Sequence, residues 1–308
     1  MESLRKEAFE NSLKELDVAF LVENQVEKIE KVGEGGFGEV FRGKYGDIDV
    51  AIKQIKFDET CEADSENDVY KILLNEIKVM LKANSPDIPK FFGIWKHEEH
   101  YHLIFEFIFG KSFKSCFNDM DKTTKLRVVR DFLGILADFH EKKLIHRDVK
   151  PDNIMIENKT NRPRLIDFGV SKIARKTATF TKMQMGTVPY MSPEMYFDED
   201  DANAEDEDAK PVPVSTYCDI WSTGVMMSEI FSGVKPWNKN EKTNINEFQI
   251  QACMVKKVNF PIPASIDDDI KELIGSALHL DYTQRPSARQ LQNKIDNILE
   301  KYLSLIHI

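Results

Sequence analysis

The spacing of apolar residues first predicts a part of the chain that is rich in strands. There, β-forming residues alternate with turns that contain glycine, as at Gly33–Gly38 and Gly46–Asp47. One segment, Asn67–Ala83, instead carries apolar residues three and four positions apart, which predicts a helix. The predicted strands are Lys28–Val32, Glu39–Tyr45, Asp49–Lys56, Lys90–Trp95 and Tyr101–Ile108.

After Gly110 the pattern changes and predicts mainly helices. Lys122–Lys142 carries an apolar face typical of an amphipathic helix, and Asp219–Phe231 is apolar enough for a buried one. The change falls near Phe109–Gly110, where we expect a hinge between two lobes. The other elements predicted here are the strands Ile154–Ile156 and Arg164–Ile166 and the helices Asp267–Leu280 and Ala288–Leu303.

Residues 1–25 are predicted to form an amphipathic helix. Phe9, Leu13, Leu16 and Phe20 recur at helical spacing and would form one apolar face. We expect this helix to pack on the following domain as a brace. The alternative is a helix that binds a partner protein.

Composition then limits the class of protein. The chain has 308 residues, of which 42% are hydrophobic and 31% charged, so it can build a sizeable core. No apolar run approaches the roughly 18 residues of a membrane span, and the first residues lack the order of a signal peptide. The four cysteines show no CxxC spacing, which favours a reducing compartment over a disulfide scaffold or zinc ribbon. We therefore expect the cytoplasm, with the nucleus as the alternative.

The net charge of −10 is unevenly distributed. Asp198–Asp208 contains eight acidic residues and no basic one, so this segment supplies most of the excess negative charge. A chain with this balance has no general attraction for nucleic acid or for an anionic membrane. We therefore expect neither as a partner.

Candidate chemistry begins with a glycine-rich loop between two predicted strands. Glycines in Gly33–Gly38 would let backbone N–H groups approach phosphate oxygens closely. The loop is not a Walker motif, because Glu39 follows it, and no helix follows as a dinucleotide site requires. Lys53 lies on the next strand among apolar neighbours, and a buried ammonium group needs a partner. Glu76, in the following helix, is the candidate.

Two further segments combine groups suited to phosphate chemistry. His146–Asn153 contains a possible base, a cation and an amide that could bind a metal ion, within eight residues. Asp167 follows a predicted strand and could hold a hard divalent cation, which prefers oxygen ligands.

Taken together, these motifs resemble the eukaryotic protein kinase family. The matches run in order from Gly33 to Arg285 and cover most of the chain. They include VAIK ending at Lys53, HRDVKPDN at 146–153, DFG at 167–169, Ser-Pro-Glu at 192–194 and the helix that begins at Asp219. The resemblance implies an α+β, two-lobed kinase fold, with a small β-rich N-lobe that holds one main helix and a larger helical C-lobe. The implied segments are a helical extension at 1–25, a kinase domain at 26–303 (N-lobe about 26–108, C-lobe about 110–303) and a tail at 304–308.

The resemblance also implies roles for individual residues. Asp148 would accept the proton of the substrate hydroxyl, and Lys150 would neutralise charge on the γ-phosphoryl group of ATP. Lys53, held by Glu76, would contact the α- and β-phosphates. Asn153 and Asp167 would bind Mg2+, or Mn2+ in its place. The implied ATP-binding residues are Gly33, Glu34, Gly35, Gly36, Phe37, Gly38, Val40, Ala51, Lys53, Phe105, Glu106, Phe107, Ile108, Ser112 and Met155.

The same resemblance favours protein substrates phosphorylated on serine or threonine. Lys150-Pro151 and Gly186-Thr187 follow the Ser/Thr-specific pattern, and some features are similar to the tyrosine-kinase-like group without assigning the subgroup. Arg147 beside Asp148 implies a switch by activation-loop phosphate, added by an upstream kinase or by a second copy of the chain. The predicted phosphosites are Thr181, then Thr179, then Thr177.

Three alternatives remain at the level of sequence. Residues 198–212 resemble an insertion, which is either a solvated loop or an acidic surface that attracts basic substrates. A pseudokinase would be expected to lose one of Lys53, Asp148, Asn153 or Asp167, and all four are present. A kinase of small molecules or lipids is disfavoured by Gly186-Thr187 and Ser192–Glu194, which belong to the peptide-binding side of the family.

Overall fold

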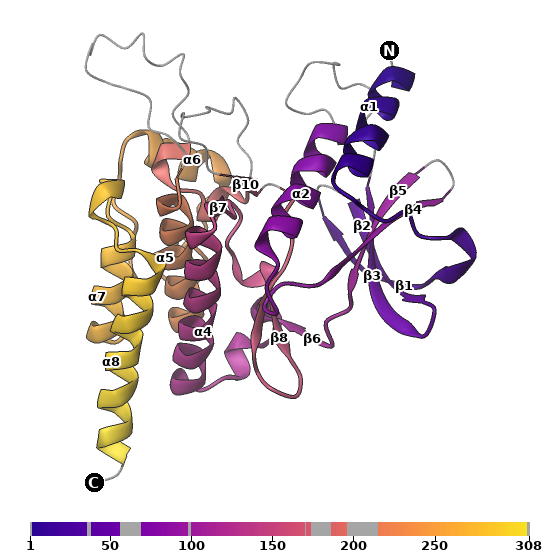
Figure 1. Cartoon of the computed structure of the whole chain (residues 1–308). Coiled ribbons are helices and arrows are strands. Elements are labelled where there is room, and N and C mark those ends of the chain that lie inside the picture. Colours follow the sequence, from indigo (N-terminus) through magenta and orange to yellow (C-terminus); the bar gives the residue numbers. More distant parts are fainter. Residues whose placement is uncertain are drawn as a thin grey trace, which may run out of the picture. The chain divides into compact units, whose positions relative to one another are not determined.

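The computed structural model divides into two compact units. It describes residues 2–35, 38–55, 69–97, 100–169, 171–173, 186–195 and 215–306. The first unit comprises Met1–Gly110 with Ile166–Gly169, and the second comprises Lys111–Leu165 with Val170–Ile308. Figure 1 colours both along the sequence. The first unit is rich in strands and the second in helices, as the apolar pattern predicted.

An antiparallel sheet of five strands forms the first unit. Its strand order is β1-β2-β3-β5-β4, so β4 lies at one edge. All five predicted strands are confirmed, with ends that differ by a few residues. The strands are β1 (Val26–Gly35), β2 (Gly38–Tyr45), β3 (Ile48–Ile55), β4 (Phe91–His97) and β5 (His100–Glu106).

The two faces of this sheet carry different residues, because successive side chains of a strand point to opposite faces. Val50 and Ile52 of β3 belong to a buried apolar cluster with Ile104 of β5. The intervening residues Ala51 and Lys53 therefore point to the opposite face. Helix α2 (Val69–Ala83) carries buried Leu73, Ile77 and Met80 at helical spacing, which confirms the predicted helix.

The N-terminal helix is shorter than its apolar spacing predicted. Helix α1 ends at Glu15, and Asp17 adopts the left-handed conformation, with φ of 54°. The chain then runs beside β4: the N–H of Leu21 donates to the carbonyl of Ile94, whose N–H donates to the carbonyl of Ala19. Residues 16–25 are therefore not the continuation of the helix, and Phe20 is 43% exposed instead of lying on its apolar face.

Helices dominate the second unit. Helix α5 is buried over most of its length, as its apolar sequence predicted, and α4 packs beside α8 (Figure 1). Helix α6, with a capping box between Asn246 and Gln249, was not predicted. The helices are α3 (Phe113–Cys116), α4 (Lys122–Glu141), α5 (Tyr217–Ser232), α6 (Glu247–Val255), α7 (Asp268–Ala277) and α8 (Ala288–Ile306). Short strands are β6 (Gly110–Ser112), β7 (Leu144–Ile145), β8 (Ile154–Glu157), β9 (Pro163–Leu165) and β10 (Lys172–Ile173).

Two expectations from composition concern the described residues. Cys116, Cys218 and Cys253 are free thiols, as their spacing predicted, and Cys61 lies outside the described residues. Within the part of the chain that the structure describes, no helix is long and apolar enough to cross a membrane.

Candidate active site

The first unit brings a buried lysine together with two carboxylates. Lys53 on β3 donates from Nζ to Oε1 of Glu76 on α2 at 2.8 Å and to Oδ1 of Asp167 at 3.0 Å. The side chains of Lys53 and Glu76 are 11% and 3% exposed, whereas that of Asp167 is 38% exposed. The partner that the sequence predicted for Lys53 is therefore confirmed, and Asp167 is a second one.

Charge and burial oppose each other in this cluster. Burial alone would lower the pKa of Lys53, but attraction by Asp167 and Glu76 outweighs it and raises that pKa above its ordinary value. Burial raises the pKa of Glu76, and the charge of Lys53 offsets part of that rise. Lys53 therefore remains a cation at neutral pH, suited to binding phosphate oxygens.

Three residues predicted to bind ATP, Val40, Ala51 and Phe105, share the sheet face of Lys53. Val40 lies directly opposite Lys53 in the register of β2 and β3, and Phe105 lies opposite Ala51 across β3 and β5. Beyond the end of β5, the backbone N–H of Ile108 has no hydrogen-bond partner among the described residues. This apolar face and the open N–H group have the chemistry that a purine ring requires.

The glycine-rich segment is the hairpin between β1 and β2. Gly35 pairs with Gly38, and Gly33 pairs with Val40. Gly38 has φ of 147°, a conformation that residues with a side chain rarely adopt. Glu34 forms a surface ion pair with Lys31 at 2.6 Å. The turn residues Gly36 and Phe37, also predicted to bind ATP, lie outside the described residues.

A second cluster, in the second unit, surrounds the carboxylate of Asp148. Lys150 donates from Nζ to its Oδ2 at 2.7 Å. Asn153, in a 3₁₀ turn at Pro151–Asn153, donates from Nδ2 to the carbonyl of Asp148 at 2.8 Å and to Oδ2 at 2.9 Å. With its nitrogen engaged in this way, the amide of Asn153 presents oxygen, the donor that Mg2+ takes. The structure therefore brings the three residues predicted here into one cluster.

Thr187 completes this cluster. Its backbone N–H and its hydroxyl both donate to Oδ1 of Asp148, at 2.9 and 2.7 Å. The hydroxyl also accepts from Nζ of Lys150 at 2.6 Å. The sequence singled out Thr187 only as part of the Ser/Thr-specific pattern, and its position 39 residues beyond Asp148 gave no signal of these contacts.

Asp219 of α5 holds the backbone of the segment that carries Asp148. Its Oδ1 accepts from the N–H of Arg147 at 2.8 Å, and its Oδ2 accepts from the N–H of His146 at 2.9 Å. Asp219 therefore braces the backbone of this segment. Nε2 of His140 lies 2.8 Å from Oδ2 of Asp219. This contact was not predicted from the sequence, because the two residues are 79 positions apart. Burial would raise the pKa of Asp219, but these hydrogen bonds, led by that of His140, lower it.

The backbone at both sites adopts an uncommon conformation. Arg147 has φ of 70° and Asp167 has φ of 62°, although neither is glycine. Residues other than glycine hold such angles only where the surrounding structure fixes them, as the hydrogen bond from Arg147 to Asp219 does. The backbone direction at Arg147, next to Asp148, is therefore set in part by Asp219, 72 positions further along the chain.

Two other polar groups stabilise the second unit. Arg285 and Glu194 form a bidentate ion pair at 2.5 and 2.8 Å, almost fully buried. Glu229 of α5 accepts from the hydroxyl of Tyr190 at 2.5 Å and from Lys114. Burial raises the pKa of Tyr190 well above its usual range, so this phenol stays a donor. Sequence reasoning missed the second group.

Some predicted residues have other contacts or lie outside the described residues. The Ser112 hydroxyl caps α3 by accepting from the N–H of Ser115 at 3.3 Å, a structural use of that side chain. The carboxylate of Glu106 accepts from the N–H of Lys90, and the N–H of Phe107 donates to the carbonyl of Asp49. Met155 lies on β8 in the second unit. Thr177, Thr179, Thr181 and residues 198–212 lie outside the described residues.

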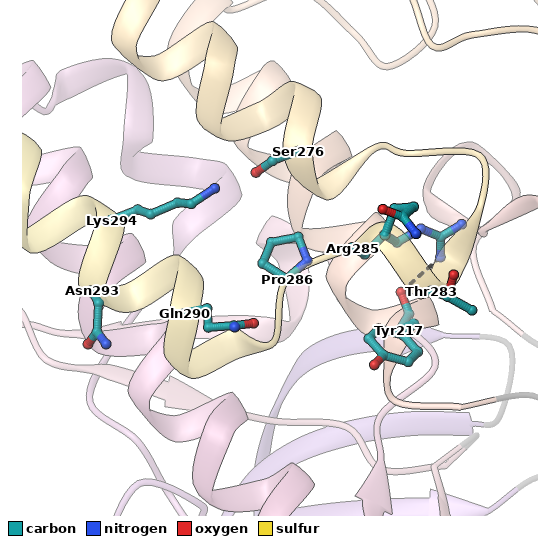
Figure 2. A pocket seen from close by; sticks show the side chains of 9 residues that line it. Tyr217, Ser276, Thr283, Arg285, Pro286, Gln290, Asn293 and Lys294 are labelled. Atoms are coloured by element: carbon teal, nitrogen blue, oxygen red, sulfur yellow. Dashed lines mark hydrogen bonds between the residues drawn. The ribbon is translucent and has the colours of Figure 1, made fainter.

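The second unit also contains a surface pocket of about 640 Å³. Figure 2 shows Lys294 and Gln290 on α8 facing Ser276 of α7, with Arg285 donating to the carbonyl of Tyr217. Its lining is polar, and none of the residues predicted to bind nucleotide belongs to it. The pocket therefore lies beside the buried Arg285–Glu194 pair and is not the nucleotide site.

Comparison with known proteins identifies the class. The family model of the protein kinase domain matches residues 26–295, and the chain belongs to this family. The chain is 30% identical to Aurora kinase of Candida glabrata over 92% of its length and 72% of that protein. It is 30% identical to RasGEF domain-containing serine/threonine-protein kinase X of Dictyostelium discoideum, over 70% of the chain and 21% of that protein. It is 27% identical to mitogen-activated protein kinase kinase kinase 2 of Arabidopsis thaliana, over 84% of the chain and 39% of that protein.

These matches confirm the resemblance drawn from the motifs. The chain has the two-lobed kinase fold and is a protein serine/threonine kinase of unassigned subgroup. It spans less than two-fifths of the length of the last two relatives. Kinases of this family use ATP and a divalent metal ion, typically Mg2+.

The described residues fit such a metal ion. Among them, no group of three or more His, Cys, Asp or Glu could enclose an ion by itself. Mg2+ in phosphoryl-transfer sites usually takes only one or two protein oxygens and completes its shell with phosphates and water. The half-exposed carboxylate of Asp167 and the amide oxygen of Asn153 are ligands of this kind.

Proposed function

We propose that this chain transfers the γ-phosphoryl group of ATP to serine and threonine hydroxyls of proteins, with the two described clusters as its machinery. One observation carries the proposal: the carboxylate of Asp148 is fixed by Lys150, Asn153 and both donors of Thr187. A carboxylate held at this many points, 9% exposed and beside a lysine, suits the binding and deprotonation of a hydroxyl.

Each cluster contributes a separate part of the reaction. Lys53, kept cationic by Glu76 and Asp167, binds the α- and β-phosphates. Asp148 orients the substrate hydroxyl and accepts its proton, while Lys150 stabilises the negative charge of the transferred group. Asn153 and Asp167 would hold Mg2+, or Mn2+ in its place, and the bound ion would neutralise charge on the phosphates.

The nucleotide base would be held by the first unit and by Met155. Val40, Ala51 and Phe105 supply an apolar surface, and the N–H of Ile108 supplies a donor. A small number of directed polar groups in an apolar site is the usual arrangement for a purine. Gly33–Gly38 would cover the phosphates with backbone N–H groups.

The decisive experiment measures transfer from radiolabelled ATP by the purified chain. The acceptors are the chain itself and a basic protein, in Mg2+ and then in Mn2+. Phosphate on serine or threonine, mapped by mass spectrometry and lost in Asp148→Asn, would support the proposal. Phosphate on tyrosine alone would overturn the specificity. Nucleotide binding without transfer, even after treatment with an activating kinase, would indicate a pseudokinase.

Regulation and substrate choice are part of the proposal. We infer that phosphate on Thr181, or on Thr179 or Thr177, activates the chain through Arg147, and that an upstream kinase or a second copy adds it. Residues 198–212 would favour basic substrates. Replacing each threonine by alanine should abolish activation only at the true site, and deleting 198–210 should weaken phosphorylation of basic peptides. Unchanged kinetics in either case would refute that part.

A further inference from the structure

Helix α1 contacts the helix that carries Glu76 through a cluster of three aromatic rings. The ring of Phe9 lies 5.2 Å from that of Tyr70 on α2 and 5.2 Å from that of Tyr101 on β5, measured between centroids. Tyr70 and Tyr101 meet edge to face at 6.2 Å. Phe9 and Tyr101 are 3% and 1% exposed, so the cluster is an interior contact. Figure 1 shows α1 beside α2.

A hydrogen bond fixes the position of α1 in this cluster. The buried hydroxyl of Tyr101 donates to Oε1 of Glu10 at 2.7 Å, and Glu10 follows Phe9 directly in α1. A bond to a carboxylate is stronger and more directional than ring packing alone. The helix can therefore neither rotate nor slide without losing this bond.

The chain after α1 is tied to the same sheet. Ala19 and Leu21 form backbone hydrogen bonds with Ile94 on β4. Gly93 allows this approach: a Cβ atom at this position would lie 2.3 Å from the carbonyl oxygen of Ala19. Since β4 pairs with β5, which carries Tyr101, α1 is held at its C-terminal connection as well as along its buried face.

Helix α2 transmits this constraint to the Lys53–Glu76 pair. Tyr70 lies in the first turn of α2 and Glu76 lies about 9 Å further along its axis, at 1.5 Å per residue. Glu76 reaches Lys53 at 2.8 Å, so a small rotation or displacement of α2 would break the ion pair. The aromatic cluster contacts the first turn of α2 through Tyr70, six residues before Glu76.

We propose that α1 is a positioning element for phosphoryl transfer, which holds α2 through Phe9 and the Glu10–Tyr101 hydrogen bond so that Glu76 stays paired with Lys53. This inference rests on the proposed function. It assigns the N-terminal segment a task in the reaction beyond general stability. Phe9, Glu10 and Tyr101 contact one another and α2, and none belongs to the residues assigned to nucleotide or substrate, so they are positioning residues and not catalytic ones.

The experiment compares kinetics in two backgrounds. Tyr101→Phe removes only the hydroxyl, and Phe9→Ala removes the central ring. In the wild-type background we expect kcat/KM for ATP to fall about fivefold with Tyr101→Phe and at least tenfold with Phe9→Ala. Tyr45→Phe and Glu7→Gln are matched controls, away from the cluster, and should stay within twofold. Circular dichroism confirms that each variant is folded at the assay temperature.

The same variants are then made with Glu76→Gln, which removes the carboxylate that α1 is proposed to position. There, Tyr101→Phe and Phe9→Ala should change kcat/KM by less than twofold, because the pair is already lost. An equal loss in both backgrounds, or a lower melting temperature with unchanged kinetics in the wild-type background, would overturn the inference and leave a merely structural role.

Nucleotide affinity separates this inference from the proposed function. The dissociation constant of a fluorescent ATP analogue needs no turnover, and it depends on Lys53 held by Glu76. If the wild-type chain binds the analogue but transfers no phosphate, the proposed activity is refuted, whereas the binding measurements still test the role of α1. Weaker binding in Tyr101→Phe and Phe9→Ala, but not in Tyr45→Phe, would support it, and equal affinity in all four chains would overturn it.

Discussion

Replacement of Thr187 by valine tests how far the hydroxyl of this residue supports Asp148. Valine keeps the shape of threonine and the backbone N–H that donates to Asp148, but it removes the hydroxyl. That hydroxyl bonds Oδ1 of Asp148 at 2.7 Å and Nζ of Lys150 at 2.6 Å. It is thus the one group of this cluster that contacts both side chains.

The expected magnitude follows from these two bonds. A hydrogen bond to a charged group contributes about 1.5–3 kcal/mol. Asp148 and Lys150 keep their direct contact at 2.7 Å, so the loss should correspond to about one such bond and not two. At about 1.4 kcal/mol for each factor of ten, kcat should fall by about 10- to 100-fold. The KM for ATP should change little, because the side chain of Thr187 bonds Asp148 and Lys150 and not Lys53, which is assigned to the α- and β-phosphates.

The assay is steady-state phosphorylation of a peptide at saturating ATP, with Thr187→Ser as the matched control. Serine keeps the hydroxyl and loses only the methyl group, so its kcat should stay within about threefold of wild type. The reasoning would be refuted if Thr187→Val kept more than half of kcat, or if Thr187→Ser were equally impaired. In the Asp148→Asn background, Thr187→Val should add little further loss.

Three further predictions concern stability. His102 is buried and donates from Nδ1 to the carbonyl of Trp95. Burial lowers the pKa of His102 from 6.5 to about 4, and the charge of Lys28 adds to this effect, with smaller contributions from His97 and His100. The neutral form of His102 therefore stabilises the fold fully above pH 6.5, and up to about 3 kcal/mol of that stability is lost as the pH falls towards 4. In urea unfolding, the free energy of unfolding of His102→Leu should decline less over this range than that of the wild type. An equal decline would contradict the assignment. Asp219→Asn removes a buried charge that binds two backbone N–H groups and His140. The free energy of unfolding in urea at pH 7 should therefore fall by about 2–4 kcal/mol, and kcat should fall as well. Full stability would exclude the bracing role. Gly93 and Gly46 both have positive φ, but only a Cβ at Gly93 would collide with backbone, so Gly93→Ala should lower the melting temperature clearly more than Gly46→Ala, and equal shifts would show that the crowding is relieved without cost.

The sequence was sufficient to predict elements and contacts that depend on residues of the same segment or of consecutive segments. The Lys53–Glu76 pair could be predicted because a lysine among apolar strand residues needs a partner and the next helix carries one. The clustering of Asp148, Lys150 and Asn153 follows from their proximity in a short segment. Helix α2 could be predicted because its apolar residues recur regularly.

Contacts between distant segments could not be predicted in this way. His140 and Asp219 are 79 positions apart, and Lys114 and Glu229 are 115 apart, so only the packing of α5 brings them together. The end of α1 was missed because the apolar spacing continues to Phe20, while the left-handed Asp17 turns the chain towards β4. Helix α6 was missed because only Ile250 and Met254 are buried in it, although its Asn246–Gln249 capping box was a usable signal.

The strip of chain at Ala19–Leu21 has a consequence for solubility. Strand β4 is an edge of the five-stranded sheet, and an uncovered edge offers unpaired N–H and C=O groups to the strands of other molecules. Here the protein's own N-terminal segment occupies part of that edge through Ile94. A fragment cut at residue 26, where the family match begins, would keep every catalytic group and yet expose this edge. Such a fragment would lose the contacts of α1 with α2 and would in addition be prone to self-association through β4.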